Sequence, residues 1–294
     1  MISIDPKTTA TPELHQYLVG SIAPRPIAFA STLDETGRPN LAPYSFFNVF
    51  SSNPPILVFS SNRRVGDNTT KDTLHNVQAT GEVVINVVNY SIVRQMALAS
   101  IQYPSEVSEF EKSGLTPIAS DLIKPFRVKE SPVQMECKVQ QILPLGEKGG
   151  AGHLIICEIL RLHLDETILD DSGKINPHKI DLMGRMGRAF YVRASGEAIH
   201  TIFQPVDKLG IGYSALPLTA RNSRILTGNH LGLLASMTEP PSTAEIAAIR
   251  QEQKVAAILR SKKPLEGLHH YAQLELAKEK IAQAAALVWL AEEL

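Results

Sequence analysis

The chain has 294 residues, of which 44% are hydrophobic and 20% charged, and its formal net charge is -1. This length and composition predict a substantial core, arranged as one large domain or as one domain with an extension. The near-neutral charge argues against nucleic acid as a partner, and no apolar segment approaches the roughly 18 residues of a membrane span. The N-terminus lacks a signal-peptide pattern, and Cys137 and Cys157 lack C-x-x-C spacing. We therefore expect a protein of the reducing cytoplasm with no membrane partner.

The first part of the chain reads as a leader followed by a restricted entry into a sheet. Residues 1–20 have no pattern that suggests chemistry. Pro24 and Pro26 then bracket Arg25, which forces an extended backbone and removes two hydrogen-bond donors, so this segment should lie at a sheet edge or a bulge. Arg25 is either an exposed structural side chain or a contact to a ligand or a partner subunit.

Three apolar, β-prone runs follow, at residues 27–31, 41–49 and 56–60. Turn-forming residues separate them at 34–37 and 53–55. Strands joined by such short turns pair with their neighbours in the chain, so the sequence predicts an antiparallel meander.

A polar and cationic stretch comes directly after the third run. Its hydrogen-bonding and charged residues are Ser60, Asn62, Arg63, Arg64, Lys71, Asp72 and Thr73. Asp72 can cap a short helix that Gly81 ends. Amide groups, hydroxyls and positive charge at a strand end and a helix start suit a phosphate group. The alternative is a solvated loop whose charges serve solubility.

The middle of the chain predicts two helices and a long hairpin. The helices are expected at 91–100, after a serine cap, and at 106–112. Strands are expected at 133–143 and 153–162, joined by a glycine-rich turn. This turn lacks the spacing of a phosphate-binding loop and does not open a helix, so we interpret it as a hairpin loop at the mouth of a site.

The last part of the chain is predicted to be helical. Ser242 and Glu245 have the spacing of a capping box for a helix to residue 260, and a second helix is expected over 265–294. We therefore predict two parts, 1–203 and a mostly helical 204–294. The pair His269 and His270 has no further ligands at suitable spacing, so no metal site is predicted.

Several segments in one order resemble the flavin reductase-like family, over about residues 21–194. They read PRPIAFAST, GRPNLAPYSFFNVFSSNPP, KDTLHN, EVVINVV, SEFEKSGLT, GHLIICEILRLHLDETIL and RMGRAFY. The resemblance implies a mainly β fold with peripheral helices, namely an antiparallel FMN-binding split β-barrel that forms a homodimer. The residues after 203 would then be an added C-terminal α-helical extension.

The resemblance also implies which residues form the site. The flavin would face the segment that holds Asn40, Ala42, Pro43, Tyr44, Ser45 and Phe46, whereas the alternative is an ordinary strand with alternate residues in the core. The cofactor tail would lie by Ser60 and Asn62 and by the KDT segment, where Lys71 and Thr73 hold the phosphate and Asp72 orders the helix start.

Three further positions complete the expected site. His153 matches a family histidine near the flavin, and we expect it to contribute to catalysis by donating to a flavin carbonyl or to the nicotinamide amide; the alternative is a hydrogen-bonded residue at a strand edge. Arg185 and Tyr191 lie in the segment that corresponds to an arginine and aromatic patch over the flavin. The alternative for that segment is a glycine-containing turn.

The function implied is an FMN-binding oxidoreductase, an NAD(P)H-dependent flavin reductase that passes hydride to flavin N5. Electrons would go on to a second acceptor, which is a small molecule or a protein. The chain has no G-x-G-x-x-G that opens a helix after a strand, so NAD(P)H would bind over the flavin without a domain of its own. Two alternatives remain, a flavoredoxin-like electron-transfer protein and a non-catalytic FMN-binding module.

Overall fold

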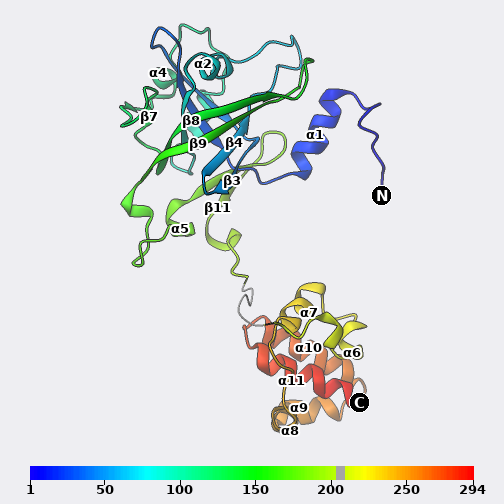
Figure 1. The fold of residues 1–294 in the computed structure, drawn as a ribbon. Helices are drawn as coiled ribbons and strands as arrows, with labels where there is room; N and C mark the ends of the chain where they lie inside the picture. The colour runs from blue at the N-terminus through cyan, green and yellow to red at the C-terminus, as the bar shows by residue number, and fades with distance from the viewer. Residues whose placement is uncertain (203–208) are drawn as a thin grey trace. The chain divides into compact units, whose positions relative to one another are not determined.

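The computed structural model describes residues 1–202 and 209–294, which form two compact units, Met1–His200 and Thr201–Leu294 (Figure 1). The predicted boundary between residues 203 and 204 lies outside the described residues. Among the described helices, none combines the length and the apolar character needed to cross a membrane.

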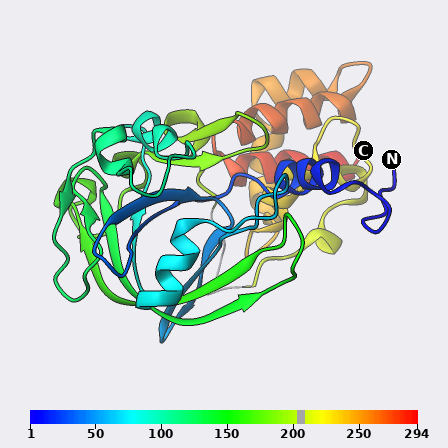
Figure 2. The same ribbon diagram turned by 90° about the horizontal axis from the view of Figure 1, so that it is seen from above.

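The first unit is built on a seven-stranded antiparallel sheet with the order β2-β1-β5-β8-β9-β4-β3. The strands are β1 Ala28–Leu33, β2 Pro39–Tyr44, β3 Phe47–Ser52, β4 Pro55–Ser60, β5 Glu82–Val87, β8 Val133–Pro144 and β9 His153–Leu164. Figure 2 shows these strands curving around one another, with helix α2 (Asp72–Thr80, cyan) against them. The long β8–β9 hairpin and its connecting loop are as predicted.

Apolar side chains cover both faces of this sheet. Every residue of β1 is buried, including the polar Ser31 and Thr32. Ala28 and Ala30 belong to one core cluster, together with Phe59 and Ile85. Phe29 points to the opposite side and joins a second cluster that includes residues of helix α3. β1 thus lies between two cores and pairs with β2 on one side and β5 on the other.

The predicted antiparallel pairing of neighbouring runs is present, but the middle run is not one continuous strand. The run 41–49 forms two strands, β2 and β3, which lie at opposite edges of the sheet. β2 pairs with β1, whereas β3 pairs with β4. The chain passes from one hairpin to the other at Ser45 and Phe46, where the backbone amide of Ser60 donates to Phe46 O at 2.8 Å. The apolar pattern continues through this crossing because both strands are partly buried, so no turn residue marks it.

Shorter elements surround the sheet. They are α1 Thr11–Ser21, α3 Val93–Leu98, α4 Glu109–Ser113, α5 Pro177–Ile180, the 3₁₀ helices Glu166–Ile168 and Gly196–Ala198, and the strand pairs β6 Pro117–Ile118 with β7 Arg127–Val128 and β10 Leu182–Arg185 with β11 Tyr191–Ala194. α2 ends at Gly81 in the left-handed conformation, as predicted. The predicted cap was wrong: Lys71 occupies that position without a side-chain bond, and Asp72 is the first helical residue.

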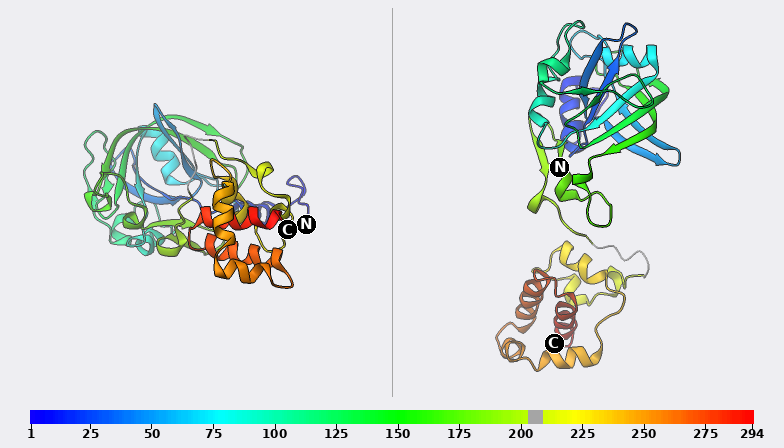
Figure 3. Two further views of the ribbon diagram at one scale, coloured as in Figure 1. Left: turned by 90° about the horizontal axis from the view of Figure 1, so that it is seen from below. Right: turned by 90° about the vertical axis from the view of Figure 1, so that its left-hand side faces the viewer.

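The second unit is helical, as Figure 3 shows. Its elements are the 3₁₀ helix Tyr213–Ala215, α6 Leu218–Arg221, α7 Gly228–Ala235, α8 Thr243–Arg250, α9 Gln253–Leu259, α10 Pro264–Leu276 and α11 Ile281–Glu292. The predicted capping box is present, since Ser242 and Glu245 bond reciprocally. Each of the two predicted long helices is in fact a pair. The first breaks at Glu252, which is extended, and the second before Ile281, where Glu279 has φ 61°. The unit has its own core, in which Leu268 and Leu287 are fully buried.

Candidate functional site

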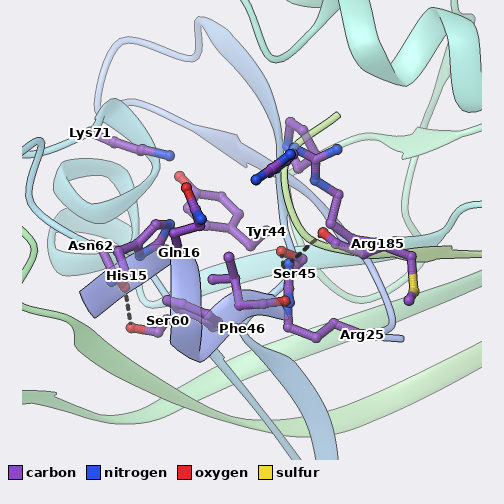
Figure 4. A pocket seen from close by; sticks show the side chains of 14 residues that line it. His15, Gln16, Arg25, Tyr44, Ser45, Phe46, Ser60, Asn62, Lys71 and Arg185 are labelled. Atoms are coloured by element: carbon purple, nitrogen blue, oxygen red, sulfur yellow. Dashed lines mark hydrogen bonds between the residues drawn. The ribbon is translucent and has the colours of Figure 1, made fainter. Parts of the chain in front are cut away.

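The largest group of predicted site residues surrounds a cavity of about 450 Å³ beside the β2–β3 crossing (Figure 4). Its walls come from α1, from the end of β2, from the end of β4 and from β10 with the turn that follows. The lining residues are His15, Gln16, Val19, Arg25, Pro43, Tyr44, Ser45, Phe46, Ser60, Asn62, Lys71, Arg185, Met186 and Arg188. The crossing therefore brings residues from distant parts of the chain to one place.

The glycine-rich loop between β8 and β9 supports one wall of this cavity. Ser60 Oγ donates to Asn62 Oδ1 at 2.8 Å, and Asn62 Nδ2 donates to the carbonyl of Gly150 at 3.1 Å. Gly152 lies so close that a Cβ there would be 2.5 Å from Ser60 Oγ. The backbone of the loop also bonds to Arg63 in both directions. The loop is therefore part of the wall and fixes the orientation of Ser60 and Asn62.

Arg25 is buried, with 7% of its surface accessible, so the alternative of an exposed structural side chain is wrong. Its guanidinium donates to the carbonyls of Val19 and Ile22 at the end of α1, and to that of Met186 at 3.1 Å. It also reaches Ser45 Oγ at 3.3 Å. One side chain thus joins α1, the β2–β3 crossing and the segment after β10, and it still lines the cavity.

The cavity has a marked excess of positive charge. Four of its described lining residues are cationic, namely Arg25, Lys71, Arg185 and Arg188. None of the described lining residues is acidic. Burial, followed by the charge of Arg64, lowers the pKa of Lys71. Burial and the nearby Arg185 likewise lower the pKa of Arg25. Cations in this situation are stabilised by an anion, because no carboxylate of the lining compensates them.

A smaller cavity of about 160 Å³ shares Pro43, Tyr44 and Lys71 with the first. Its other walls hold Asn40, Ala42, Arg64, Asp72, Thr73, Glu109 and the segment 99–103. Asn40 Nδ2 donates to Thr73 Oγ1 at 2.8 Å, which ties β2 to the first turn of α2. The two cavities thus meet at the start of α2, where the partial positive charge of a helix N-terminus adds to that of Lys71.

Tyr44 separates the two cavities. The Lys71 ammonium lies 4.8 Å from the centre of its ring, and Phe59 packs at 5.3 Å between ring centroids. Its hydroxyl is buried near the side chains of Thr73 and Ser61 and makes no hydrogen bond of good geometry with the described residues. Burial raises the pKa of this phenol, so it stays protonated and can donate. A buried polar group without a partner costs about 1–3 kcal/mol, and a bound ligand with an acceptor would remove that cost.

The structure brings together twelve of the fourteen predicted site residues. Pro43, Tyr44, Ser45, Phe46, Ser60, Asn62, Lys71 and Arg185 line the larger cavity, and Asn40, Ala42, Asp72 and Thr73 line the smaller one. His153 and Tyr191 line neither. Whether these residues hold a cofactor stays a prediction.

The two remaining residues each contact a residue beside or in the cavity wall. His153 is buried, and its ring Nδ1 lies 3.1 Å from the carbonyl of Ser61. Its backbone pairs with Ser61 in both directions, so it supports the Ser60 end of β4. Tyr191 is 38% exposed and stacks under the Arg185 guanidinium at 4.6 Å. In this arrangement both residues can act on the cavity by positioning a neighbour.

Sequence reasoning missed the contribution of α1. His15, Gln16 and Val19 lie on one face of this helix and line the larger cavity. His15 also meets Phe46 edge to face, with 6.1 Å between ring centroids. The spacing of these residues was visible in the sequence, but no motif marks them, and the leader was assigned no chemistry.

Asp121, Glu136 and His163 form a group outside this cavity that could in principle ligate a metal. Both oxygens of the buried Glu136 accept backbone amides, from Asp121 at 2.8 Å and Leu122 at 2.7 Å. His163 Nε2 bonds to the same carboxylate at 2.7 Å. These ligand atoms already have hydrogen-bond partners, so we interpret the group as a structural hydrogen-bond network.

Comparison with known proteins identifies the family. The model of the flavin reductase like domain matches residues 20–177, which is more than half of the chain. The chain belongs to the flavin reductase-like family. It is also 40% identical to an uncharacterized protein of Aquifex aeolicus over 191 residues, which are 65% of this chain and 95% of that protein.

Two solved structures are similar to the first unit. Nitrilotriacetate monooxygenase component B from Bacillus cereus is 32% identical, with a TM-score of 0.63 over 69% of this chain and 98% of that one. A split barrel domain protein from Shewanella frigidimarina, 24% identical, has a TM-score of 0.58 over 69% of this chain and 99% of that one. The predicted fold, a split barrel followed by a helical region, is confirmed. Family membership gives the chain a flavin-related role in oxidation-reduction or electron transfer.

Proposed function

We propose that this flavin reductase-like protein binds FMN in the two joined cavities and is reduced by NAD(P)H. The observation that carries the proposal is the group of four cations around the larger cavity with no acidic lining residue. FMN has a flat ring with a hydrogen-bonding edge and a phosphate with close to two negative charges, and these features match the lining.

The lining suggests a role for each part of the site. The segment Pro43–Phe46 and the Tyr44 hydroxyl face the ring, and the phosphate lies by Lys71, where the cavities meet at the start of α2. Arg25 contributes charge, but its bonds to three carbonyls make it first a positioning residue. Arg185 and Arg188, on the β10 side of the cavity, can receive the phosphates of NAD(P)H.

When bound, FMN would supply the redox chemistry, as the group that accepts a hydride from the nicotinamide. The residues of the chain bind and orient the two partners. His153 stays a candidate for tuning the site through Ser61 and the end of β4. Electrons then pass to a second acceptor, a small molecule or a protein. We also propose that the protein acts as a homodimer in the cytoplasm.

The test is to mix FMN-loaded protein anaerobically with NADH and, separately, with NADPH. The absorbance of the flavin band is then measured over time. We expect one or both donors to bleach the yellow colour within seconds. A protein that holds FMN without bleaching would instead be an electron-transfer flavoprotein or a binding module. Reduction by dithionite followed by reoxidation with protein or dye acceptors separates those two outcomes. A protein that does not hold FMN at all contradicts the proposal.

A further inference from the structure

The helical second unit carries a groove of about 670 Å³ that the flavin site does not use. It lies between α6 with the turn that follows it and one face of α10. Leu218, Ile225 and Leu265 give it apolar walls, and Leu218 is 55% exposed. Every lining residue belongs to the second unit, so the groove is a property of that unit alone.

His269 lies in this groove and is almost completely buried, with 2% of its surface accessible. Its Nδ1 is 2.9 Å from Ser223 Oγ. That oxygen also accepts the backbone amides of Ile225 and Leu226, both at 3.1 Å. Because the two lone pairs of the hydroxyl are thus used, its proton goes to Nδ1 of His269. The neutral ring therefore carries its own proton on Nε2.

The Nε2 donor of His269 is buried and has no partner among the described residues. Burial lowers the pKa of this histidine, which agrees with a neutral ring. A buried N–H without an acceptor is costly, and native proteins seldom keep one without a reason. A ligand that brings an acceptor into the groove would satisfy it.

The charges around the groove indicate what kind of acceptor fits. Glu292 accepts the backbone amides of Leu218 and Thr219, so its oxygens have partners at the start of α6, while its charge raises the pKa of His269 against the larger effect of burial. Glu266 is paired with Lys263 at 3.0 Å. Arg224, by contrast, is an exposed lining residue that makes no ion pair with the described part of the chain. Among the described lining groups, the buried N–H of His269 and the cation of Arg224 are therefore the two that can meet a carboxylate, and Asn222 and His270 add exposed polar side chains.

We propose that this groove is a second binding site, which takes a small carboxylate with an apolar body. The carboxylate accepts from His269 Nε2 and pairs with Arg224, and the apolar body lies against Leu218, Ile225 and Leu265. Ser223 is a positioning residue, since it fixes the tautomer of His269. This site is independent of the proposed flavin chemistry.

The experiment is calorimetric titration of the full chain with hexanoate and 3-phenylpropionate, beside the matching alcohols. We expect the acids to bind and the alcohols to bind at least about tenfold more weakly, since a hydrogen bond to a charged group contributes about 1.5–3 kcal/mol. Nitrogen-detected spectra of histidine-labelled protein should show the Nε2 resonance of His269 move on addition of acid. If neither acid binds at millimolar concentration, the proposal is wrong.

Variants place the binding in the groove and separate it from the cationic cavity of the first unit. Arg224→Glu should weaken acid binding at least tenfold, whereas Arg260→Glu, an equal charge change at another exposed arginine of this unit, should not. His269→Phe removes both ring nitrogens and should abolish binding, and His269→Gln, which retains a donor near Nε2, should restore part of it. If the His269 variants do not fold, acid binding by Arg224→Glu is sufficient to test the proposal. Acid binding unchanged in Arg224→Glu overturns the proposal.

Discussion

At the scale of single residues, Lys71 is the most informative position of the candidate site. It lines both cavities and lies over the Tyr44 ring, and the ion pairs within the described chain do not include it. Burial of a charged lysine without a carboxylate partner costs free energy, and a bound anion reduces that cost. Its contribution should therefore appear in ligand binding more than in folding.

We predict that Lys71→Met weakens FMN binding by about tenfold to a hundredfold, which corresponds to about 1.5–3 kcal/mol for a hydrogen bond to a charged group. Flavin fluorescence quenching measures the affinity. Lys129→Met, at an exposed lysine of the same unit, is the matched control and should bind FMN as the unchanged protein does. Equal affinity in Lys71→Met and in the control would remove Lys71 from the site.

The pH dependence of binding provides a second readout for Lys71. Because burial lowers its pKa in the free protein, Lys71 loses its charge at a lower pH than an ordinary lysine. Affinity for FMN should thus be highest below that pKa and should fall as the pH rises through it. Lys71→Met should lack this fall. The phosphate is already doubly ionised above neutral pH, so its own titration does not mask the effect.

At the scale of elements, local pattern predicted which runs form strands and pair, but not where one run divides into two strands. The apolar runs around β1, β4, β5, β8 and β9 were visible, as was the glycine that ends α2. The crossing at Ser45 and Phe46 was not, because there the chain leaves β1 and Phe46 accepts a hydrogen bond from Ser60, fourteen residues further on. Long-range partners of this kind leave no local signal.

The lack of a local signal also explains which site residues and which helix ends the sequence did not predict. The cavity residues of β2 and α2 were found through the resemblance to a family, while His15 and Gln16 were not, because their role depends on where Arg25 holds α1. In the second unit, the helix breaks at Glu252 and Glu279 carry no glycine or proline. Tertiary packing ended those helices where propensity alone would have continued them.

The edge strand β3 is the element whose exposed surface bears most directly on assembly. It lies at the end of the sheet, and Val49 and Phe50 on it are 54% and 69% exposed. An exposed apolar edge strand is a liability for a monomer and a natural surface for a second copy. A substitution on β3 is therefore the most direct test, within the first unit, of the proposed homodimer.

We predict that Phe50→Lys raises the dissociation constant of the dimer at least about tenfold, because it places a charge in an apolar interface. Sedimentation equilibrium measures the change. Leu122→Lys, which alters an exposed apolar residue away from β3, should leave the dimer intact. A wild-type protein that is monomeric at tens of micromolar would rule out the homodimer, and an unaffected Phe50→Lys dimer would move the interface elsewhere.

At the scale of the whole molecule, the chain combines two units with separate cores. The lining residues of both flavin-site cavities lie within Met1–His200, and the core of the second unit is formed by its own helices. The Aquifex aeolicus relative supports this division, since 191 aligned residues cover 95% of its length. A family member of that size consists of little more than the first unit.

We therefore predict that a protein of residues 1–200 folds by itself and binds FMN within about threefold of the full chain's affinity, because no lining residue is lost. Circular dichroism and fluorescence titration measure folding and affinity. The control is the Lys71→Met variant of the shortened protein, which should lose affinity by the same factor as in the full chain, since distant sites contribute independently. A shortened protein that is folded but binds FMN more than tenfold more weakly would show that the helical unit completes the flavin site.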